Sequence, residues 1–356
     1  MSVISQSRPF VIGVDCHART HTYAVIDALT GQVLACEQFP AAHAGLCRAL
    51  SWVARRTGGD ATALWVIEGI GTYGAGIARV VADAGYDVVE APRMNARGRR
   101  GTGKSDPLDA QRIAAGVLGL DEQQLRRPRQ DQGVRAALRT LVSAREQLAT
   151  ERTMKVNALT ALLRVNALGI DARRPLAKAQ ILTVSKWRER DESLEVVVAR
   201  EEAVRIARRI GELGEQLVAN EARMTSLIQA TPAAPLLEIR GVGAVTAATF
   251  ITAWSHPGRV RSEAAFASLA GACPIPASSG NTSRHRLNRG GDRRLNRALH
   301  IATMVRMTHD PETRVYTERR LREGRSTRDI RRSLKRYLAR SIYRQLNALH
   351  EAQTMA

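Results

Sequence analysis

The sequence predicts an α/β domain built on a mixed β-sheet, followed by a helical middle region and a mainly helical, strongly basic C-terminal region. Three observations support this division. Apolar runs of strand length alternate with helical patterns in the first third of the 356 residues, a long helical repeat occupies the middle, and the positive charge is concentrated in the last third. We therefore expect domains over residues 1–130, 131–230 and 231–356.

The first third contains five apolar runs that predict strands. These are Phe10–Val14, His21–Asp27, Gln32–Phe39, Ala63–Ile67 and Tyr86–Ala91. The turn signal Ala28-Leu29-Thr30-Gly31 joins the second and third runs, and helical spacing at Gly45–Arg56 and Gly76–Ala84 separates the later ones. Hairpin-linked strands followed by βαβ units predict a mixed sheet with helices on its faces.

The middle third has the spacing of long helices. Residues 134–164 are helical in pattern, and a second stretch repeats apolar residues at alternating spacings of four and three with one polar position: Ile206, Ile210, Leu213, Leu217, Asn220, Met224 and Leu227. Such a seam is typical of a coiled coil, in which one polar residue can fix the register. Two interpretations remain open, namely dimerisation through this seam and a helical hairpin within one chain.

The last third follows Thr231-Pro232-Ala233-Ala234-Pro235, which has the composition of a linker. Helical patterns there are interrupted by a Gly/Ser-rich loop at Pro274–Gly291, and the final helical pattern, Asp329–Leu349, carries many arginines. This third holds 22 basic and 9 acidic residues, and 49 of the chain's 54 basic residues are arginine. Because the guanidinium fork matches phosphate oxygens, the net charge of +20 indicates a nucleic-acid partner.

Composition excludes several classes. A hydrophobic content of 44% excludes a disordered chain. No run of 18 apolar residues is present, so we expect no membrane span, and the N-terminus lacks the layout of a signal peptide. The four cysteines form no CxxC pair, which fits a reducing, cytoplasmic location.

Two stretches resemble phosphate-binding loops. Gly69–Gly74 matches GxGxxG after a predicted strand, but Glu68 directly before it would face a pyrophosphate with like charge. Gly98–Ser105 matches the letters of a Walker A loop, but Asp106-Pro107 follows at once, so we expect Asp106 to be extended and the helix to begin at Pro107. We interpret the second match as accidental and the stretch as a basic loop.

Four carboxylates form the main candidate site. Asp15 ends the first predicted strand, Glu68 ends the fourth, and Asp106 and Asp109 lie three apart at a helix start, where they share a face. Four converging acids repel one another unless they surround cations, and their oxygen atoms suit Mg²⁺. Two such ions can clamp both oxygens in phosphodiester cleavage. Taken alone, Asp106-Pro107 with Asp109 is also an ordinary helix N-cap.

Several motifs together resemble a known family. They are Ile12-Gly13-Val14-Asp15, Ile67-Glu68 with Gly71-Thr72-Tyr73, Lys104–Ala110, Ile239–Gly243, Leu269–Pro274, Ser279-Gly280 and Arg293–Leu299. The order of strands and acids is similar to an RNase H-like, RuvC-type nuclease domain with a DEDD set. The whole set resembles the "one-ten" family of insertion-sequence transposases, which are bridge-RNA-guided DEDD recombinases.

This resemblance implies a mechanism and partners. Asp15, Glu68, Asp106 and Asp109 would bind Mg²⁺, with two ions per site, and a serine in the C-terminal domain would form a transient phosphoserine link to DNA. Ser279 matches that serine, although Ser278 stands beside it. The family also implies a guide RNA that pairs with donor and target DNA, and a dimer or tetramer with composite sites.

Basic and glycine-rich segments are the candidates for nucleic-acid contacts. Ile239–Gly243 resembles a helix-hairpin-helix turn, in which Gly241 and Gly243 would present backbone N–H groups to a phosphate; an ordinary tight turn is the alternative. The remaining candidates are basic side chains: Arg99, Arg100, Lys104, Arg284, Arg286, Arg289, Arg293 and Arg294.

We expect an RNA-guided DNA recombinase of a mobile element, acting in the cytoplasm on nucleoid DNA. Three alternatives remain. A RuvC-like structure-specific nuclease would use water and no covalent serine, a nucleic-acid-binding protein would have an inactive acidic site, and an NAD enzyme would use Gly69–Gly74. Metal-dependent cleavage separates the first from the second, and a cofactor titration tests the third.

Overall fold

The computed structural model describes residues 2–92, 105–129, 132–278, 280, 285–286, 288 and 290–355. The chain divides into two compact units, Met1–Arg129 and Gln130–Ala356. The division lies at the first of the two expected boundaries. Residues 131–230 and 231–356, which we expected as separate domains, belong to one unit.

The first unit is an α/β structure. Its elements are α1 (Ile4–Ser7), β1 (Phe10–Cys16), β2 (Thr20–Asp27), β3 (Val33–Pro40), α2 (His43–Thr57), β4 (Leu64–Ile67), α3 (Ala75–Asp83), β5 (Asp87–Glu90) and α4 (Asp106–Ala115). The five strands form one sheet in the order β3-β2-β1-β4-β5. Strands β1, β2 and β3 pair antiparallel, whereas β1, β4 and β5 pair parallel. This confirms the predicted mixed sheet.

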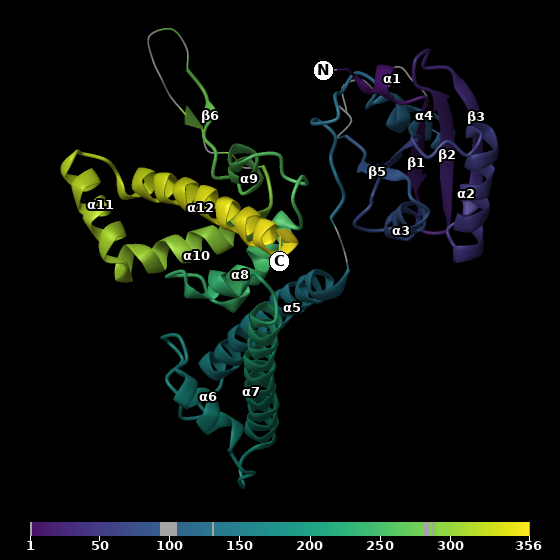
Figure 1. Cartoon of the computed structure of the whole chain (residues 1–356). Coiled ribbons are helices and arrows are strands. Elements are labelled where there is room, and N and C mark those ends of the chain that lie inside the picture. Colours follow the sequence, from purple (N-terminus) through teal and green to yellow (C-terminus); the bar gives the residue numbers. More distant parts are fainter. Residues whose placement is uncertain are drawn as a thin grey trace. The chain divides into compact units, whose positions relative to one another are not determined.

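Helices cover both faces of the sheet (Figure 1). On one face, Ile12 and Val14 of β1 pack with Trp65 of β4 against helices α2 and α3. On the other, Val11 of β1 packs with residues of β4 and β5 against helix α4. Because side chains alternate along a strand, Gly13 and Asp15 point to the same face as Val11, which is the face that α4 covers.

At Gly13 the backbone of α4 approaches strand β1 closely. A Cβ atom at residue 13 would lie 2.1 Å from the carbonyl oxygen of Ala110 and 2.6 Å from the backbone nitrogen of Ala114. Both atoms belong to the helix backbone and cannot rotate away. Only glycine therefore lets α4 rest directly on β1, two residues before Asp15.

We predict that Gly13→Ala destabilises the protein by about 3 kcal/mol, because the added methyl group forces α4 off the sheet. Gly119→Ala is the matched control, since a Cβ there meets no atom within 4 Å. Urea unfolding followed by circular dichroism measures both. Equal stability of the two variants would contradict the close-packing role of Gly13.

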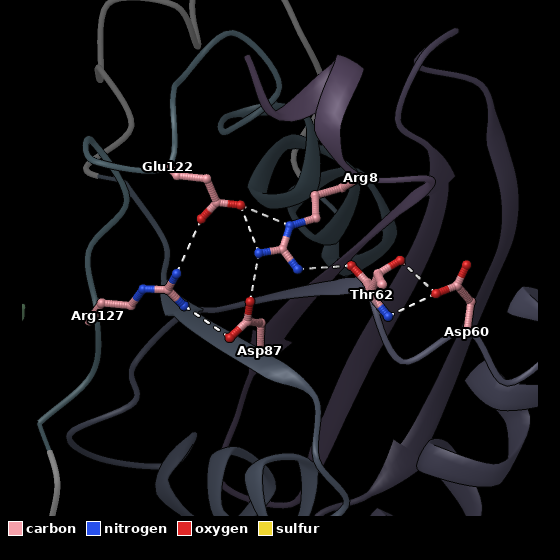
Figure 2. Close-up of polar contacts among 6 residues, drawn as sticks. All are labelled: Arg8, Asp60, Thr62, Asp87, Glu122 and Arg127. Carbon is pink, nitrogen blue, oxygen red and sulfur yellow. Dashed lines mark hydrogen bonds and ion pairs between the residues drawn. The ribbon is translucent and has the colours of Figure 1, made fainter. Parts of the chain in front are cut away.

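An ion-pair network joins three segments of the first unit (Figure 2). Arg8 contacts the Oδ2 atom of Asp87 at 2.6 Å and the Oε1 atom of Glu122 at 2.7 Å. Arg127 contacts the other oxygens of the same two acids, at 3.2 and 3.1 Å. The Nη1 atom of Arg8 donates to the carbonyl of Thr62. The network thus fastens the chain before β1 and the chain after α4 to strand β5.

We predict that this network makes stability depend on pH. Burial acts to raise the pKa of Asp87, but hydrogen bonds and charges from Arg8 and Arg127 outweigh it and lower the pKa below its ordinary value of 3.8. An acid with a lowered folded-state pKa stabilises the fold above its ordinary pKa and loses that contribution as the pH falls through the lowered value.

Arg8→Met should therefore cost about 1 kcal/mol at pH 7, given the solvent screening of a partly exposed pair, and progressively less below about pH 4. Thermal unfolding between pH 7 and 2.5 measures the difference. Arg48→Met, at an exposed position of α2, serves as the control. A cost for Arg8→Met that stays constant over this range would rule out the network as its source.

The second unit is mainly helical. Its elements are α5 (Gly133–Val165), α6 (Lys178–Ser185), α7 (Leu194–Gln229), the 3₁₀ helix η2 (Ala234–Glu238), α8 (Ala244–Trp254), α9 (Glu263–Leu269), β6 (Ile275–Pro276), β7 (His285–Arg286), α10 (Arg293–His309), α11 (Pro311–Arg322) and α12 (Thr327–Met355).

The apolar seam of α7 is covered within the chain. Helices α5 and α7 pack along each other (Figure 1). Ile206 and Ile210 share a core with Leu159 of α5, and the amide of the buried Asn220 donates to the carbonyl of Leu141 at 3.1 Å. The structure thus shows the helical hairpin, the second of the two interpretations left open by the sequence.

The expected linker after residue 230 is part of a folded segment. Leu236, in η2, is 1% exposed and joins a core that also contains Leu138 of α5, Met224 of α7 and residues of α8, α10 and α12. Because the ends of the long helices supply part of this core, the chain has no separable boundary at this point. The linker prediction was wrong because composition alone does not reveal that the leucine directly after Pro235 is buried.

Among the described residues, no helix combines the length and the apolar character that a membrane span requires.

Candidate metal and nucleic-acid sites

Two of the expected acids emerge side by side from the sheet. Strands β1 and β4 run parallel with Val14 opposite Ile67, and the next backbone N–H, that of Glu68, donates to the carbonyl of Val14 at 3.0 Å. Asp15 and Glu68 therefore occupy equivalent positions at the carboxyl ends of adjacent parallel strands. Asp15 is 6% exposed, whereas Glu68 is exposed.

Helix α4 brings the other two acids to this edge. It begins at Asp106, and Ser105 is the extended residue before it, with φ −152° and ψ 151°. The expectation that Asp106 would be extended and that the helix would begin at Pro107 was wrong. Pro107 fits within the first turn because the N–H that proline lacks would have no helical partner there. Asp106 and Asp109 both fall in this turn.

Asp15, His17 and Asp106 form the candidate metal cluster. One ligand atom from each lies within 4.8 Å of the others. The Nε2 atom of His17 lies 3.1 Å from Oδ2 of Asp15 and 3.6 Å from Oδ1 of Asp106. His17 was missed in the sequence, although its place two residues after Asp15, just beyond a buried strand, could have signalled it.

Asp109 and Glu68 lie beside this cluster and are not members of it. Asp109 is 9% exposed, and its carboxylate pairs with Arg112 at 3.1 Å. Its charge nevertheless acts on Asp15, as does that of Asp106. The charges of Asp15 and Glu68 both act on Cys16, where burial first and then these carboxylates raise the thiol pKa to about 12. Asp106 and Asp109 thus act on Asp15 directly, whereas Glu68 acts on the neighbouring Cys16.

Burial and repulsion from nearby acids both disfavour the ionised form of Asp15. Burial has the largest effect on its pKa and raises it; His17 acts in the opposite direction, and the nearby Asp106 and Asp109 raise it further. The net shift is upward. A buried carboxylate held among like charges gains most from a cation, so the site favours a metal ion on electrostatic grounds.

The donor set fits a divalent ion. Carboxylate oxygens of Asp15 and Asp106 suit Mg²⁺ or Mn²⁺, with Glu68 and Asp109 within the same surroundings. The imidazole of His17 is the borderline donor, because Mg²⁺ prefers oxygen. In the structure His17 bridges the two carboxylates as a hydrogen-bonding neighbour of Asp15.

The second unit contains a β-arm where the sequence predicted a loop. Ile275 pairs with Arg286 and Pro276 with His285 in two short antiparallel strands. Ser278, which is exposed, follows the first of them. Ser279, the expected nucleophile, lies outside the described residues, as do the expected nucleic-acid contacts Arg284, Arg289, Arg99, Arg100 and Lys104.

The turn before α8 has one glycine with a packing role and one without. Gly241 has a φ of +85°, and a Cβ there would lie 2.7 Å from the carbonyl oxygen of Ala302 in α10. Gly243 precedes the first residue of α8 and has open space around it. Its lack of a side chain leaves the helix N-terminus uncapped, so the first N–H groups of α8 can meet an anion.

The arginines expected to contact nucleic acid differ in whether their side chains are already paired within the chain. Arg294 pairs with Glu146 of α5 at 2.6 Å, which holds α10 to α5. Arg286, on β7, and Arg293, at the start of α10, are both exposed. These two side chains are open to a ligand, whereas Arg294 must first leave Glu146.

Comparison with known proteins identifies the family. A model of IS110 DEDD transposases, described as "Transposase", matches residues 12–166, and a model described as "Transposase IS116/IS110/IS902 family" matches residues 233–318. The chain belongs to the IS110 family of transposases. The first match begins in β1 and contains all four acids, and the second contains Gly241, Gly243 and the β-arm.

A curated relative shares part of this IS110-family sequence. The "Insertion element IS110 uncharacterized 43.6 kDa protein" of Streptomyces coelicolor is 36% identical over 115 residues. The matched segment covers 32% of this chain and 28% of that relative. The similarity therefore extends over little more than a quarter of the relative's length.

We predict that Asp15→Asn separates stability from metal binding in this IS110-family protein. A folded-state pKa that is raised makes the ionised Asp15 unfavourable, so the metal-free wild type loses stability as the pH rises through the ordinary aspartate range. The variant lacks this cost and should melt at or above the wild-type temperature at pH 7.5 without metal.

Addition of Mg²⁺ or Mn²⁺ should raise the melting temperature of the wild type above that of Asp15→Asn. A metal at a hundredfold excess over its Kd stabilises a folded site by about 2.7 kcal/mol, and the variant should lose most of this gain. Differential scanning calorimetry with and without metal measures it, and Asp83→Asn, at an exposed position of α3, is the control. A variant that gains as much as the wild type would show that Asp15 holds no ion.

Proposed function

We propose that this chain is an RNA-guided DNA recombinase of an insertion sequence, which cleaves and exchanges DNA strands in a metal-dependent reaction through a covalent phosphoserine intermediate. Membership of the IS110 transposase family supports DNA as the substrate. The net charge of +20 supports a nucleic-acid partner. The protein would act in the cytoplasm, on the DNA of the nucleoid.

One observation carries this proposal: Asp15, on a sheet strand, meets Asp106, on helix α4, in a cluster that suits a metal ion. Glu68 stands at the equivalent end of the adjacent strand. Without a bound cation the acidic cluster would lower the stability of the fold, because repulsion and burial both disfavour the charged form of Asp15. The presence of such a cluster on a chain rich in arginine supports a site for metal-dependent phosphodiester chemistry.

Asp15, Glu68, Asp106 and Asp109 would hold the metal, which we take to be Mg²⁺ in two copies. When bound, such ions supply a nucleophile-activating charge and stabilise the oxygens of the phosphodiester as it breaks. The protein's own part is to hold these carboxylates in place through the contact of α4 with Gly13. His17 would help to orient the Asp15 carboxylate.

The serine step is proposed from the sequence resemblance. The hydroxyl oxygen of Ser279 would attack a DNA phosphorus and lose its proton, while the oxygen of the broken ester leaves and takes up a proton. A serine hydroxyl needs activation, and no His–Asp pair is patterned around residue 279 in the sequence. Activation would then come from the acidic site, of the same protomer or of another in a dimer or tetramer.

RNA guidance is likewise proposed from the resemblance. Base pairing of the element's RNA with donor and target DNA would select the sequence, and the protein would hold backbones. The uncapped N-terminus of α8 at Gly243 and the exposed Arg286 and Arg293 are the described candidates for such contacts. Backbone N–H groups at a helix N-terminus contact phosphate oxygens and carry no sequence information, which fits a division of labour between RNA and protein.

We predict a covalent protein–DNA adduct as the decisive product. The protein is expressed with its native flanking DNA, so that any RNA encoded there is present, and the complex is run on a denaturing gel. The wild type should give an adduct that requires Mg²⁺. Ser279→Ala should abolish it, and Asp15→Ala should reduce it at least about a thousandfold, because metal stabilisation supplies several kcal/mol.

Ser278→Ala is the matched control and should leave the adduct intact. Nucleic-acid binding by Asp15→Ala should stay near the wild-type level, since the change removes a negative charge. Cleaved DNA without an adduct in any lane would overturn the serine step and favour a hydrolytic RuvC-like nuclease. Full activity of Asp15→Ala would overturn the metal site.

A further inference from the structure

A cluster of cations lies where α10 and α12 pack together. Arg331 and Lys335 are one turn apart on α12, with Arg336 next to Lys335. His300 comes from α10, one turn after Asn296. The Nζ atom of Lys335 donates to Oδ1 of Asn296 at 2.8 Å, which joins the two helices. We refer to His300, Arg331, Lys335 and Arg336 as the α10–α12 cation cluster.

These cations have no carboxylate partner within the part of the chain that the structure describes. Arg336 donates to the sulfur of Cys273, and Arg331 to the carbonyl of Thr327. Other arginines of α12 are paired differently: Arg332 with Asp329, and Arg340 and Arg344 with Glu263. The cluster therefore differs from these three arginines in being uncompensated.

The arrangement is unfavourable for the free protein. Burial lowers the pKa of Lys335. Burial first, and then the charges of Lys335 and Arg331, lower the pKa of His300. A half-buried ammonium among like charges costs stability, and an apolar side chain of the same length would avoid that cost. An anion bound between the helices would offset it. The cluster is accessible to such an anion, because His300 is exposed and Arg331, Lys335 and Arg336 are partly exposed.

The cluster lies at the base of the β-arm. Asn296, which holds Lys335, also donates to the carbonyl of Ala270 at 2.6 Å. Gly271 follows with a φ of +63°. Arg336 contacts Cys273, two residues before β6. Arg336 is thus in direct contact with the segment that leads into β6, and Lys335 is joined to that segment through Asn296.

We propose that the α10–α12 cation cluster binds a backbone phosphate of DNA and so fixes the strand that is presented to the arm. Lys335 is the central contact, Arg331 and Arg336 flank it, and His300 closes the rim. The inference rests on the proposed function in that DNA is taken as the substrate of this unit. DNA is favoured over RNA because the cluster adjoins the arm that would attack DNA.

Lysine footprinting tests this directly, because the chain has only five lysines, at positions 104, 155, 178, 186 and 335. The full-length wild type is treated with an amine-acylating reagent, alone and with a saturating 30-base-pair DNA duplex, and modification is read by mass spectrometry. Lys335 should become at least about fivefold less reactive with DNA. Lys178 and Lys186, exposed in or next to α6, are the internal references and should change less.

Lys335→Met provides the energetic test. Loss of one phosphate contact should reduce the steepness of the plot of log association constant against log salt concentration by about one. Binding of the same duplex should weaken about tenfold near 0.1 M salt. The variant should also melt at or above the wild-type temperature. Arg332→Met removes one charge from the same helix at a paired, more exposed position and should leave the slope nearly unchanged.

The outcomes are distinct. Equal reactivity of Lys335 with and without DNA, equal protection of all lysines, or protection by single-stranded RNA alone would overturn the proposal. So would an equal loss of affinity in Lys335→Met and Arg332→Met. Protection of Lys335 in a protein that forms no serine adduct would uphold the phosphate site while the serine step fails, so the two proposals are tested separately.

Discussion

The backbone of helix α4 lies against strand β1 at Gly13 with no side chain between them. The rest of the candidate site depends on this contact. It sets the height of α4 above the sheet, and the first turn of the helix then brings Asp106 to within reach of Asp15 and His17. Any larger residue at position 13 would separate the helix from the strand and open the cluster. The absence of a side chain at residue 13 therefore helps to position the carboxylates of the site.

Each of the two units of the chain contains a group of like charges that burial makes unfavourable. The first gathers acids at one strand end, where burial and repulsion raise the pKa of Asp15. The second gathers cations between α10 and α12, where burial lowers the pKa of Lys335. Each arrangement costs the free protein stability, and a bound ligand of opposite charge would offset that cost. A metal ion and a nucleic-acid phosphate are the two ligands that a phosphodiester reaction brings together.

Much of the fold could be predicted from the sequence. The five strands, the mixed sheet and the two long helices follow from apolar periodicity, which reports what each segment buries. The placement of Asp15 and Glu68 at adjacent strand ends follows from the strand order. By contrast, the start of α4 at Asp106 was mispredicted because proline is tolerated in the first turn of a helix. The burial of Leu236, directly after the expected linker, was missed because its packing partners are distant in the sequence. His17 was overlooked for a similar reason, since its contact with Asp106 crosses from strand to helix.

The sequence by itself determined the five strands of the sheet and the long helices, the acidic residues that end two of the strands, and the basic character of the last third. These are properties of local patterns and of composition, which do not require the chain to be folded. Only the tertiary structure decided that the α7 seam is covered by α5, that Arg294 is held by Glu146 and that Lys335 lacks a carboxylate partner among the described residues. The reason is physical: whether a charge or an apolar face is free depends on its neighbours in space, and packing alone chooses those neighbours.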